Sequence, residues 1–173
     1  DHFGLDRLLI RVVADPGHKE VDTAAEIRLR LARLAFATIA EAEVSLDPFA
    51  RTVDSLEALG LDDPVFLLGA DELVAFPTWT RPDHVLELAR IGAATRPGTD
   101  LAELERIVAS LPRPHRIELF PITPLAVSSS DIRERVATSL PIDGLVPAPV
   151  AAEIARLGLY RGDLAADEPA NHR

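Results

Sequence analysis

The sequence predicts an α/β fold, with a doubly wound, mainly parallel sheet that carries helices on both faces. Short, almost continuously apolar runs alternate with helix-like patterns along the whole chain. Apolar runs of this kind are typical of parallel strands that are buried on both sides. The 173 residues, 47% of them hydrophobic, suffice for a single core. We therefore expect one domain over residues 1–162, with a small helical part at its C-terminal end.

Five apolar runs are the expected strands. The first, Leu8–Val13, is followed by the turn residues Asp15-Pro16-Gly17, which typically end a buried strand. The other four are Ala42–Leu46, Val65–Leu68, Ile91–Thr95 and His115–Phe120. Parallel sheets bind ligands in the loops that follow the carboxyl ends of their strands. Candidate site residues are therefore expected in those loops.

Helices are expected between these strands, and capping residues mark several of their ends. Thr23 with Glu26, and Ser128 with Asp131, have the spacing of capping boxes. Gly60 and Gly158 are typical of the left-handed residue that ends a helix. The expected helical segments are Thr23–Ala40, Thr52–Leu59, Asp71–Phe76, Asp83–Ala89, Asp100–Leu111, Ser128–Ala137 and Pro149–Leu157. The polar, aperiodic residues 163–173 are expected to form a mobile tail.

The composition excludes several classes of function. Lys and Arg number 18 against 28 Asp and Glu, for a net charge of −10, whereas a nucleic-acid binder needs a basic face. The absence of cysteine excludes disulfides, thiolate metal sites and a cysteine nucleophile. No apolar run is long enough to span a membrane, and no signal peptide is recognisable. We expect a cytoplasmic protein, and Mg²⁺ would accompany any nucleotide ligand.

His18 and Lys19 follow the first strand on a Pro-Gly turn. An imidazole and an ammonium group side by side suit an anionic ligand such as a phosphate. The alternative is a polar surface loop without a ligand.

Gly69 and Asp71 follow the third strand. A glycine there allows a ligand to approach the backbone, and an acid just beyond it can accept hydrogen bonds from ribose hydroxyls. The alternative is that Asp71 caps the next helix.

Ser128, Ser129 and Arg133 surround the start of a helix. Hydroxyls and free backbone amides at a helix N-terminus form an anion site, and Arg133 could add its guanidinium to a bound phosphate. The alternative is a well-capped helix with a surface arginine.

Trp79, the only tryptophan, lies in a loop bracketed by Pro77 and Pro82. Its indole could stack on a heteroaromatic ring, although a core or lid residue is the alternative. Thr52 and Asp54 could contact a ligand or cap a helix, and capping is the default.

Taken in chain order, six segments resemble the bacterial nicotinate-nucleotide adenylyltransferase family, whose fold is Rossmann-like. The resemblance covers most of the chain from Leu5 to Tyr160. The matching segments are Pro16-Gly17-His18-Lys19, Thr52-Val53-Asp54-Ser55-Leu56, Gly69-Ala70-Asp71-Glu72-Leu73 followed by Phe76 and Trp79, Arg96-Pro97-Gly98, Ser128-Ser129-Ser130-Asp131-Ile132-Arg133, and Leu145-Val146-Pro147 with Gly158-Leu159-Tyr160.

The resemblance implies transfer of AMP from ATP to nicotinic acid mononucleotide, giving deamido-NAD and pyrophosphate, with Mg²⁺ accompanying ATP. By the same resemblance, ATP would be bound by Gly69, Ser128, Ser129 and Arg133. The acceptor nucleotide would be bound by His18, Lys19, Thr52, Asp71, Trp79 and Arg96, with Thr52 and Trp79 around the nicotinate ring.

The chain departs from the family pattern in two places. The family's N-terminal segment, whose histidines contact the ATP phosphates, is not among the 173 residues, so we expect these residues alone to be inactive or impaired. Arg51 stands where the family usually has Tyr. A cation there could contact the nicotinate carboxylate, or it could favour another phosphorylated acceptor. A non-catalytic nucleotide-binding module is the remaining alternative.

Overall fold

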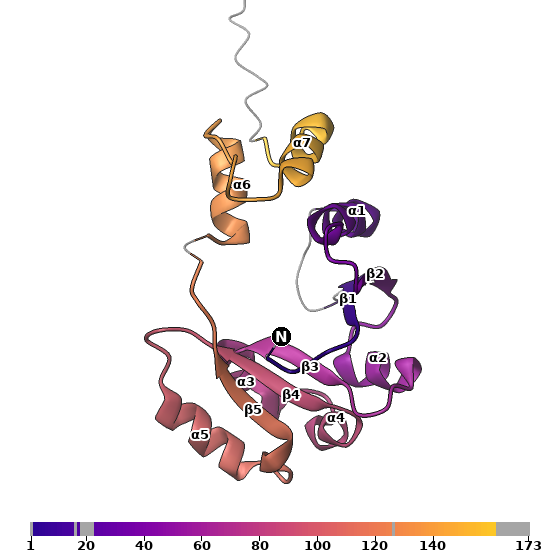
Figure 1. Cartoon of the computed structure of the whole chain (residues 1–173), viewed down its shortest axis with the longest axis vertical. Helices are drawn as coiled ribbons and strands as arrows, with labels where there is room; N and C mark the ends of the chain where they lie inside the picture. The colour runs from indigo at the N-terminus through magenta and orange to yellow at the C-terminus, as the bar shows by residue number, and fades with distance from the viewer. Residues whose placement is uncertain (1, 16, 18–22, 126, 162–173) are drawn as a thin grey trace, which may run out of the picture. The chain divides into compact units, whose positions relative to one another are not determined.

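The computed structural model describes residues 2–15, 17, 23–125 and 127–161 (Figure 1). The chain divides into two compact units. The first unit comprises Asp1–Val12, Asp22–Leu46 and Ala126–Arg173, and the second comprises Val13–Val21 and Asp47–Leu125. The expected tail, residues 163–173, lies outside the described residues. The single domain expected over residues 1–162 stays a prediction.

The second unit contains a three-stranded parallel sheet in the order β3-β4-β5. Its strands are β3 (Val65–Gly69), β4 (Arg90–Thr95) and β5 (Ile117–Pro121), which lie side by side in Figure 1. Both pairings are parallel, as the near-continuous apolar runs predict. The expected α/β fold with parallel sheets and flanking helices is confirmed.

Helices connect these strands, and their ends follow from local sequence. The α-helices are α2 (Thr52–Leu59), α3 (Ala70–Ala75), α4 (Pro82–Leu88) and α5 (Leu101–Ser110), and short 3₁₀ helices span Phe76–Thr78 (η1) and Pro114–Arg116 (η2). Gly60 ends α2 in the left-handed conformation, with φ 56°. Asp100 caps α5 by accepting a 3.0 Å hydrogen bond from the amide of Glu103.

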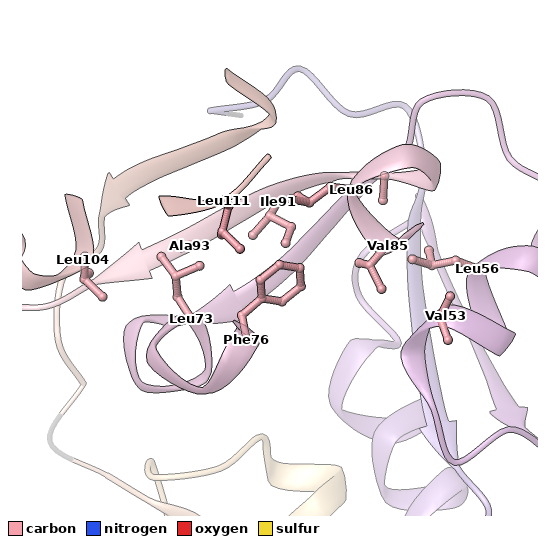
Figure 2. Packing of buried hydrophobic residues seen from close by; sticks show 11 residues of the cluster. Val53, Leu56, Leu73, Phe76, Val85, Leu86, Ile91, Ala93, Leu104 and Leu111 are labelled. Carbon is pink, nitrogen blue, oxygen red and sulfur yellow. The ribbon is translucent and has the colours of Figure 1, made fainter. Parts of the chain in front are cut away.

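The core of the second unit lies on one face of its sheet. The register places Phe66 beside Ile91, and Ile91 beside Ile117, so these side chains share a face because side chains alternate along a strand. Leu67 points to the other face and is 43% exposed. Figure 2 shows the buried side chains gathered between strands and helices. They are Val53, Leu56, Leu73, Phe76, Val85, Leu86, Ala89, Ile91, Ala93, Leu104 and Leu111.

In the first unit, three helices contribute to a smaller core. They are α1 (Ala25–Phe36), α6 (Ser129–Ala137) and α7 (Ala148–Leu157), the last ended by Gly158. The buried core residues are Ile132, Ile142, Val150 and Ile154. Glu153 on α7 is also buried, and its carboxylate forms ion pairs with Arg30 of α1 and Arg156.

The remaining strands, β1 (Leu8–Val13) and β2 (Ala42–Asp47), form a two-stranded sheet. The amide of Leu8 donates to the carbonyl of Glu41 at 3.0 Å, and that of Ala14 donates to the carbonyl of Asp47 at 2.8 Å. The residue numbers of the bonded pairs increase in the same direction along both strands, so the two strands are parallel.

One expected helix start is wrong. Ala24 is the N-cap of α1, and among the described residues no side chain caps this helix. Thr23 lies one residue too early for a capping box with Glu26, and its carbonyl accepts a hydrogen bond from Arg28 instead. The helix also ends at Phe36, before the expected Ala40. Within the described residues, no helix is both long enough and apolar enough to cross a membrane.

Candidate functional site

Gly69 and Asp71 lie at the carboxyl end of β3. Gly69 is the N-cap of α3, and a Cβ atom added to it would lie 2.9 Å from Oδ1 of Asp71. The Asp71 carboxylate thus occupies the space that a larger residue at position 69 would need. Among the described residues, no side chain caps α3, so the structure does not support the alternative interpretation of Asp71 as a helix cap. Its exposed carboxylate is available to a ligand.

Arg96 follows β4 at the same edge of the sheet. The register pairs Gly69 with Ala94, so the residues after β3 and β4 are neighbours along this edge. A tight turn holds the Arg96 backbone, because its amide donates to Oγ1 of Thr99 at 3.1 Å, its carbonyl accepts from the amide of Thr99 at 3.0 Å, and Gly98 has φ 93°. The Arg96 side chain is exposed.

Trp79 is half-buried in the loop between η1 and α4. Its ring packs edge-on to Phe66, with centroids 6.0 Å apart, and is tilted against Phe76 at 5.3 Å. One part of the indole is therefore anchored on the core of the second unit, as expected for a core residue. Another part is open to solvent, as a stacking surface requires.

Thr52 is the first residue of α2 and is half-buried. The N-cap of this helix is Arg51, and among the described residues no side chain caps it. The default expectation that Thr52 caps the helix is therefore wrong. Arg51 is exposed beside Thr52.

Asp47, which the sequence analysis did not single out, supports this end of α2. The residue is only 3% exposed. Its carboxylate accepts hydrogen bonds from Oγ of Ser55 at 2.5 Å and from the amide of Phe49 at 3.1 Å. One feature of the sequence could have identified Asp47: it ends the second apolar run and is followed by Pro48.

A charge network that the sequence analysis also missed joins α2 to α4. Arg81 donates to Asp54 and Glu57, and His84 lies 2.9 Å from Glu57 and 2.7 Å from Glu87. Hydrogen bonds from the ring to the carboxylates of Glu87 and Glu57 raise the pKa of His84. The Arg81 hydrogen bond lowers the pKa of Glu57, and His84 lowers the pKa of Glu87. We call these residues, with Arg113 on Glu87, the α2–α4 charge network.

In the first unit, Ser128 and Asp131 form the expected capping box at the start of α6. The Ser128 hydroxyl accepts from the amide of Asp131 at 3.1 Å, and the Asp131 carboxylate accepts from the amide of Ser128 at 2.8 Å. Hydrogen bonds from the Ser128 side chain and backbone lower the pKa of Asp131. The structural part of the Ser128 prediction is thus confirmed.

Ser129 and Arg133 lie on α6 beside this cap, and both are exposed. The Arg133 guanidinium donates to Oγ of Ser130 at 3.1 Å, within its own helix. The helix N-terminus, the Ser129 hydroxyl and this guanidinium each favour an anion, whereas the Asp131 carboxylate at the same helix start, to which the Ser128 hydroxyl donates at 2.7 Å, does not.

His18 and Lys19 lie outside the described residues. Before them, the amide of Gly17 donates to Oδ1 of Asp15 at 2.9 Å in a turn with φ 62° at the glycine. Within the described part of the chain, no group of three or more His, Asp or Glu side chains could hold a metal ion.

Comparisons with known proteins give one consistent result. No protein-family model matches the chain. A probable nicotinate-nucleotide adenylyltransferase of Bordetella pertussis is 37% identical over 168 residues, which are 92% of this chain and 85% of the relative. One from Thermomicrobium roseum is 37% identical over 173 residues, 93% of this chain and 80% of the relative.

A solved structure also shares the fold. Nicotinic acid mononucleotide adenylyltransferase of Plasmodium falciparum, in complex with NaAD, superposes with a TM-score of 0.72 at 15% identity. The superposition covers 90% of this chain and 83% of that one.

Proposed function

The chain belongs to the nicotinate-nucleotide adenylyltransferase family, and from this premise we propose which of its residues bind each substrate. The enzyme transfers the AMP moiety of ATP to nicotinic acid mononucleotide, forming deamido-NAD and pyrophosphate in NAD biosynthesis. The observation that supports this assignment is that the candidate residues fall into two groups. One group lies at a helix start that favours anions, and the other lies at a sheet edge with an acid that can bind a sugar.

The ATP phosphates bind at the start of α6. Backbone amides at this N-terminus favour negative charge, and the hydroxyl of Ser129 adds a donor. Ser128 holds this N-terminus in place beside the phosphates, since its own hydroxyl donates to the Asp131 carboxylate at 2.7 Å. Arg133 contributes a guanidinium fork, which suits phosphate oxygens. The exposure of all three side chains supports this role.

A nucleotide ribose lies against Gly69 and Asp71. The missing Cβ of Gly69 lets the Asp71 carboxylate lie close to the backbone at the end of β3, where it accepts hydrogen bonds from ribose hydroxyls. Arg96 lies at the same edge and, with His18 and Lys19, binds phosphate oxygens of the acceptor nucleotide.

The nicotinate ring stacks on Trp79, and Thr52 lies beside it. The half-buried indole offers an anchored aromatic face. Arg51, exposed next to Thr52, supplies a cation that pairs with the nicotinate carboxylate. The cation also supports a second candidate function, adenylyl transfer to a different phosphorylated acceptor.

The reaction requires positioning and charge neutralisation more than a protein nucleophile. A phosphate oxygen of the mononucleotide forms a bond to the α-phosphorus of ATP, and the bond from that phosphorus to the pyrophosphate oxygen breaks. Arg133 and the α6 amides stabilise negative charge on the phosphates as this bond breaks. We propose that Mg²⁺ accompanies ATP, where it would neutralise phosphate charge. We also place the enzyme in the cytoplasm.

The test is pyrophosphate release from ATP by the complete gene product, with nicotinic acid mononucleotide, nicotinamide mononucleotide or phosphopantetheine as acceptor. We expect the first to be used with the highest kcat/KM. Preferential use of another acceptor would support the second candidate function. If no pyrophosphate is released with any of the three acceptors, the protein is a non-catalytic nucleotide-binding module.

The proposed role of Arg51 is tested by a separate substitution. Replacing Arg51 with Ala should reduce the preference for the nicotinate over the nicotinamide acceptor by roughly tenfold, because a charge-assisted hydrogen bond is lost. An unchanged preference would remove Arg51 from the pyridine site.

A further inference from the structure

Arg81 has an unusual backbone conformation in the loop that carries Trp79. It lies two residues after Trp79, is the N-cap of α4, and has φ 53° and ψ 55°. This left-handed conformation is disfavoured for a residue with a side chain, and it persists where surrounding contacts hold it. Its carbonyl accepts hydrogen bonds from the amides of His84 and Val85 at 3.0 and 3.1 Å.

The Arg81 guanidinium reaches across to α2. It donates to Oδ1 of Asp54 at 2.9 Å, and to the two carboxylate oxygens of Glu57 at 2.9 and 3.2 Å. Asp54 and Glu57 are three residues apart, so they lie on one side of the helix. Asp54 is also two residues after Thr52. One side chain thus links the helical turn that carries Thr52 to the loop that carries Trp79.

Beneath this bridge, α2 and α4 already pack through apolar side chains. Val53 and Leu56 of α2, and Val85 of α4, are buried in the core of the second unit, as Figure 2 shows. The exposed ion pairs therefore add little to the adhesion of the two helices. A fork that donates to two carboxylates instead restricts how the loop lies against the helix.

We propose that Arg81 is a positioning residue for the pyridine site, which holds the Trp79 loop at a fixed place relative to Thr52. The inference rests on the proposed assignment of Thr52 and Trp79 to the nicotinate ring. Arg81 touches no substrate in this proposal. Its loss should weaken binding of the acceptor nucleotide and leave binding of ATP unchanged.

The experiment compares four substitutions in the complete gene product. Arg81→Met removes the guanidinium and keeps most of the side-chain volume. Arg81→Gly also removes the steric cost of the left-handed backbone conformation. Arg81→Lys keeps the charge but cannot donate to both carboxylates with a planar fork. Arg7→Met is the matched control, because Arg7 forms an exposed ion pair with Glu43 in the first unit.

Binding of nicotinic acid mononucleotide and of ATP is measured by calorimetry, and KM and kcat by pyrophosphate release. We expect Arg81→Met and Arg81→Gly to raise the Kd of the mononucleotide about threefold to fivefold, the range that exposed ion pairs support. Arg81→Lys should lie between these variants and the native enzyme. The Kd of ATP and kcat should stay at the native value in all of them, and Arg7→Met should change nothing.

The emission of Trp79, the only tryptophan, provides a readout that does not require turnover. In Arg81→Met, acrylamide should quench this emission more strongly than in the native protein, while far-UV circular dichroism stays the same and Tm falls only slightly, because exposed ion pairs contribute little to stability. If Arg81 had a purely structural role, its loss would lower Tm markedly and raise the Kd of both substrates together. That result would overturn the proposal.

Two further variants separate this proposal from the function on which it rests. Thr52→Ala and Trp79→Leu should each raise the Kd of the mononucleotide. If they do so and Arg81→Met does not, the positioning role is wrong and the pyridine site stands. If neither of them raises it, the assignment of the pyridine site is wrong, whatever Arg81 does.

Discussion

The two compact units bury their cores to different degrees. In the second unit seven large side chains, among them Phe76, Leu73 and Leu86, are less than 2% exposed. In the first unit the buried core residues of the described chain are Ile132, Ile142, Val150 and Ile154, at 4 to 8% exposure. A well-packed core holds its surface groups in place, because close-packed interiors have few alternative arrangements.

The two proposed binding regions, one in each unit, differ in the same way. Trp79 contacts the core of the second unit directly, so the proposed pyridine site is preorganised by apolar packing. The α6 start instead depends on a capping box of exposed side chains. Under the proposed assignment, acceptor binding would rely on the packed core of the second unit, whereas ATP binding would rely on a helix terminus.

The largest expected effect tests the difference between the cores. Ile91→Ala, in the second unit at 1% exposure, should lower the free energy of unfolding by about 4 kcal/mol, and Ile142→Ala, in the first unit at 8%, by about 2 kcal/mol. The residue type is the same, so the difference reports how tightly each site is packed. Urea unfolding measures both values. Equal costs would mean that the two cores are equally well packed.

The second prediction concerns Arg133 at the ATP side. Arg133→Met should raise the KM for ATP by about tenfold, because a hydrogen bond to a charged phosphate is lost. The KM for nicotinic acid mononucleotide should stay unchanged. Arg135→Met is the control on the same helix, since Arg135 donates to the carbonyl of Pro141 at 2.9 Å. If both variants raise the KM for ATP equally, the effect reflects the loss of positive charge on α6 in general and not a contact between Arg133 and ATP.

The order of strands and helices could be predicted from local signals. Apolar runs bounded by Pro, Gly and Asp mark all five strands, and Gly60 and Gly158 end α2 and α7 as expected. The failed capping box at Thr23 shows the limit of such signals. The spacing to Glu26 is correct, but the chain enters the helix one residue later, and an extended Ala24 takes the cap position.

The candidate site was predictable where its residues follow a strand or begin a helix. Gly69, Asp71 and Arg96 meet this condition, and the parallel register brings them to one edge. The α2–α4 charge network was not predictable in this way. Arg81 and Glu57 are separated by 24 positions, and ion pairs between distant residues on exposed helix faces leave no periodic pattern in a single sequence.

A smaller effect separates the two roles of Ser128. Ser128→Ala should lower the free energy of unfolding by about 1 kcal/mol through loss of the cap. Ser128→Thr should keep most of the cap, because a threonine hydroxyl can still donate to the Asp131 carboxylate and accept from the Asp131 amide, yet its added methyl group should weaken ATP binding by crowding the phosphates. Thermal unfolding and ATP calorimetry measure the two effects. If Ser128→Thr binds ATP as the native enzyme does, Ser128 has only the structural role.

The smallest expected effect is a pH dependence of the α2–α4 charge network. Because the pKa of His84 is raised in the folded state, its stabilising contribution is fully present below about 6.5, its ordinary value, and is lost as pH rises through the folded pKa. The pKa values of Glu57 and Glu87 are lowered. Their contributions are present above about 4.5, their ordinary value, and are lost as pH falls through the folded pKa.

The network should therefore stabilise the second unit most between about pH 4.5 and 6.5, where His84 is charged and both glutamates are ionised. Arg81, which also contacts Asp54, faces Glu57 on one side of the network, and Arg113 faces Glu87 on the other. The Tm difference between the native protein and His84→Gln should be greatest near pH 6 and should vanish as pH rises through the His84 pKa. His115→Gln is the control, because among the described residues His115 forms no ion pair. A difference that grows with pH would mean that His84 is bound in its neutral form, and the two carboxylates would then compete for one proton on the ring.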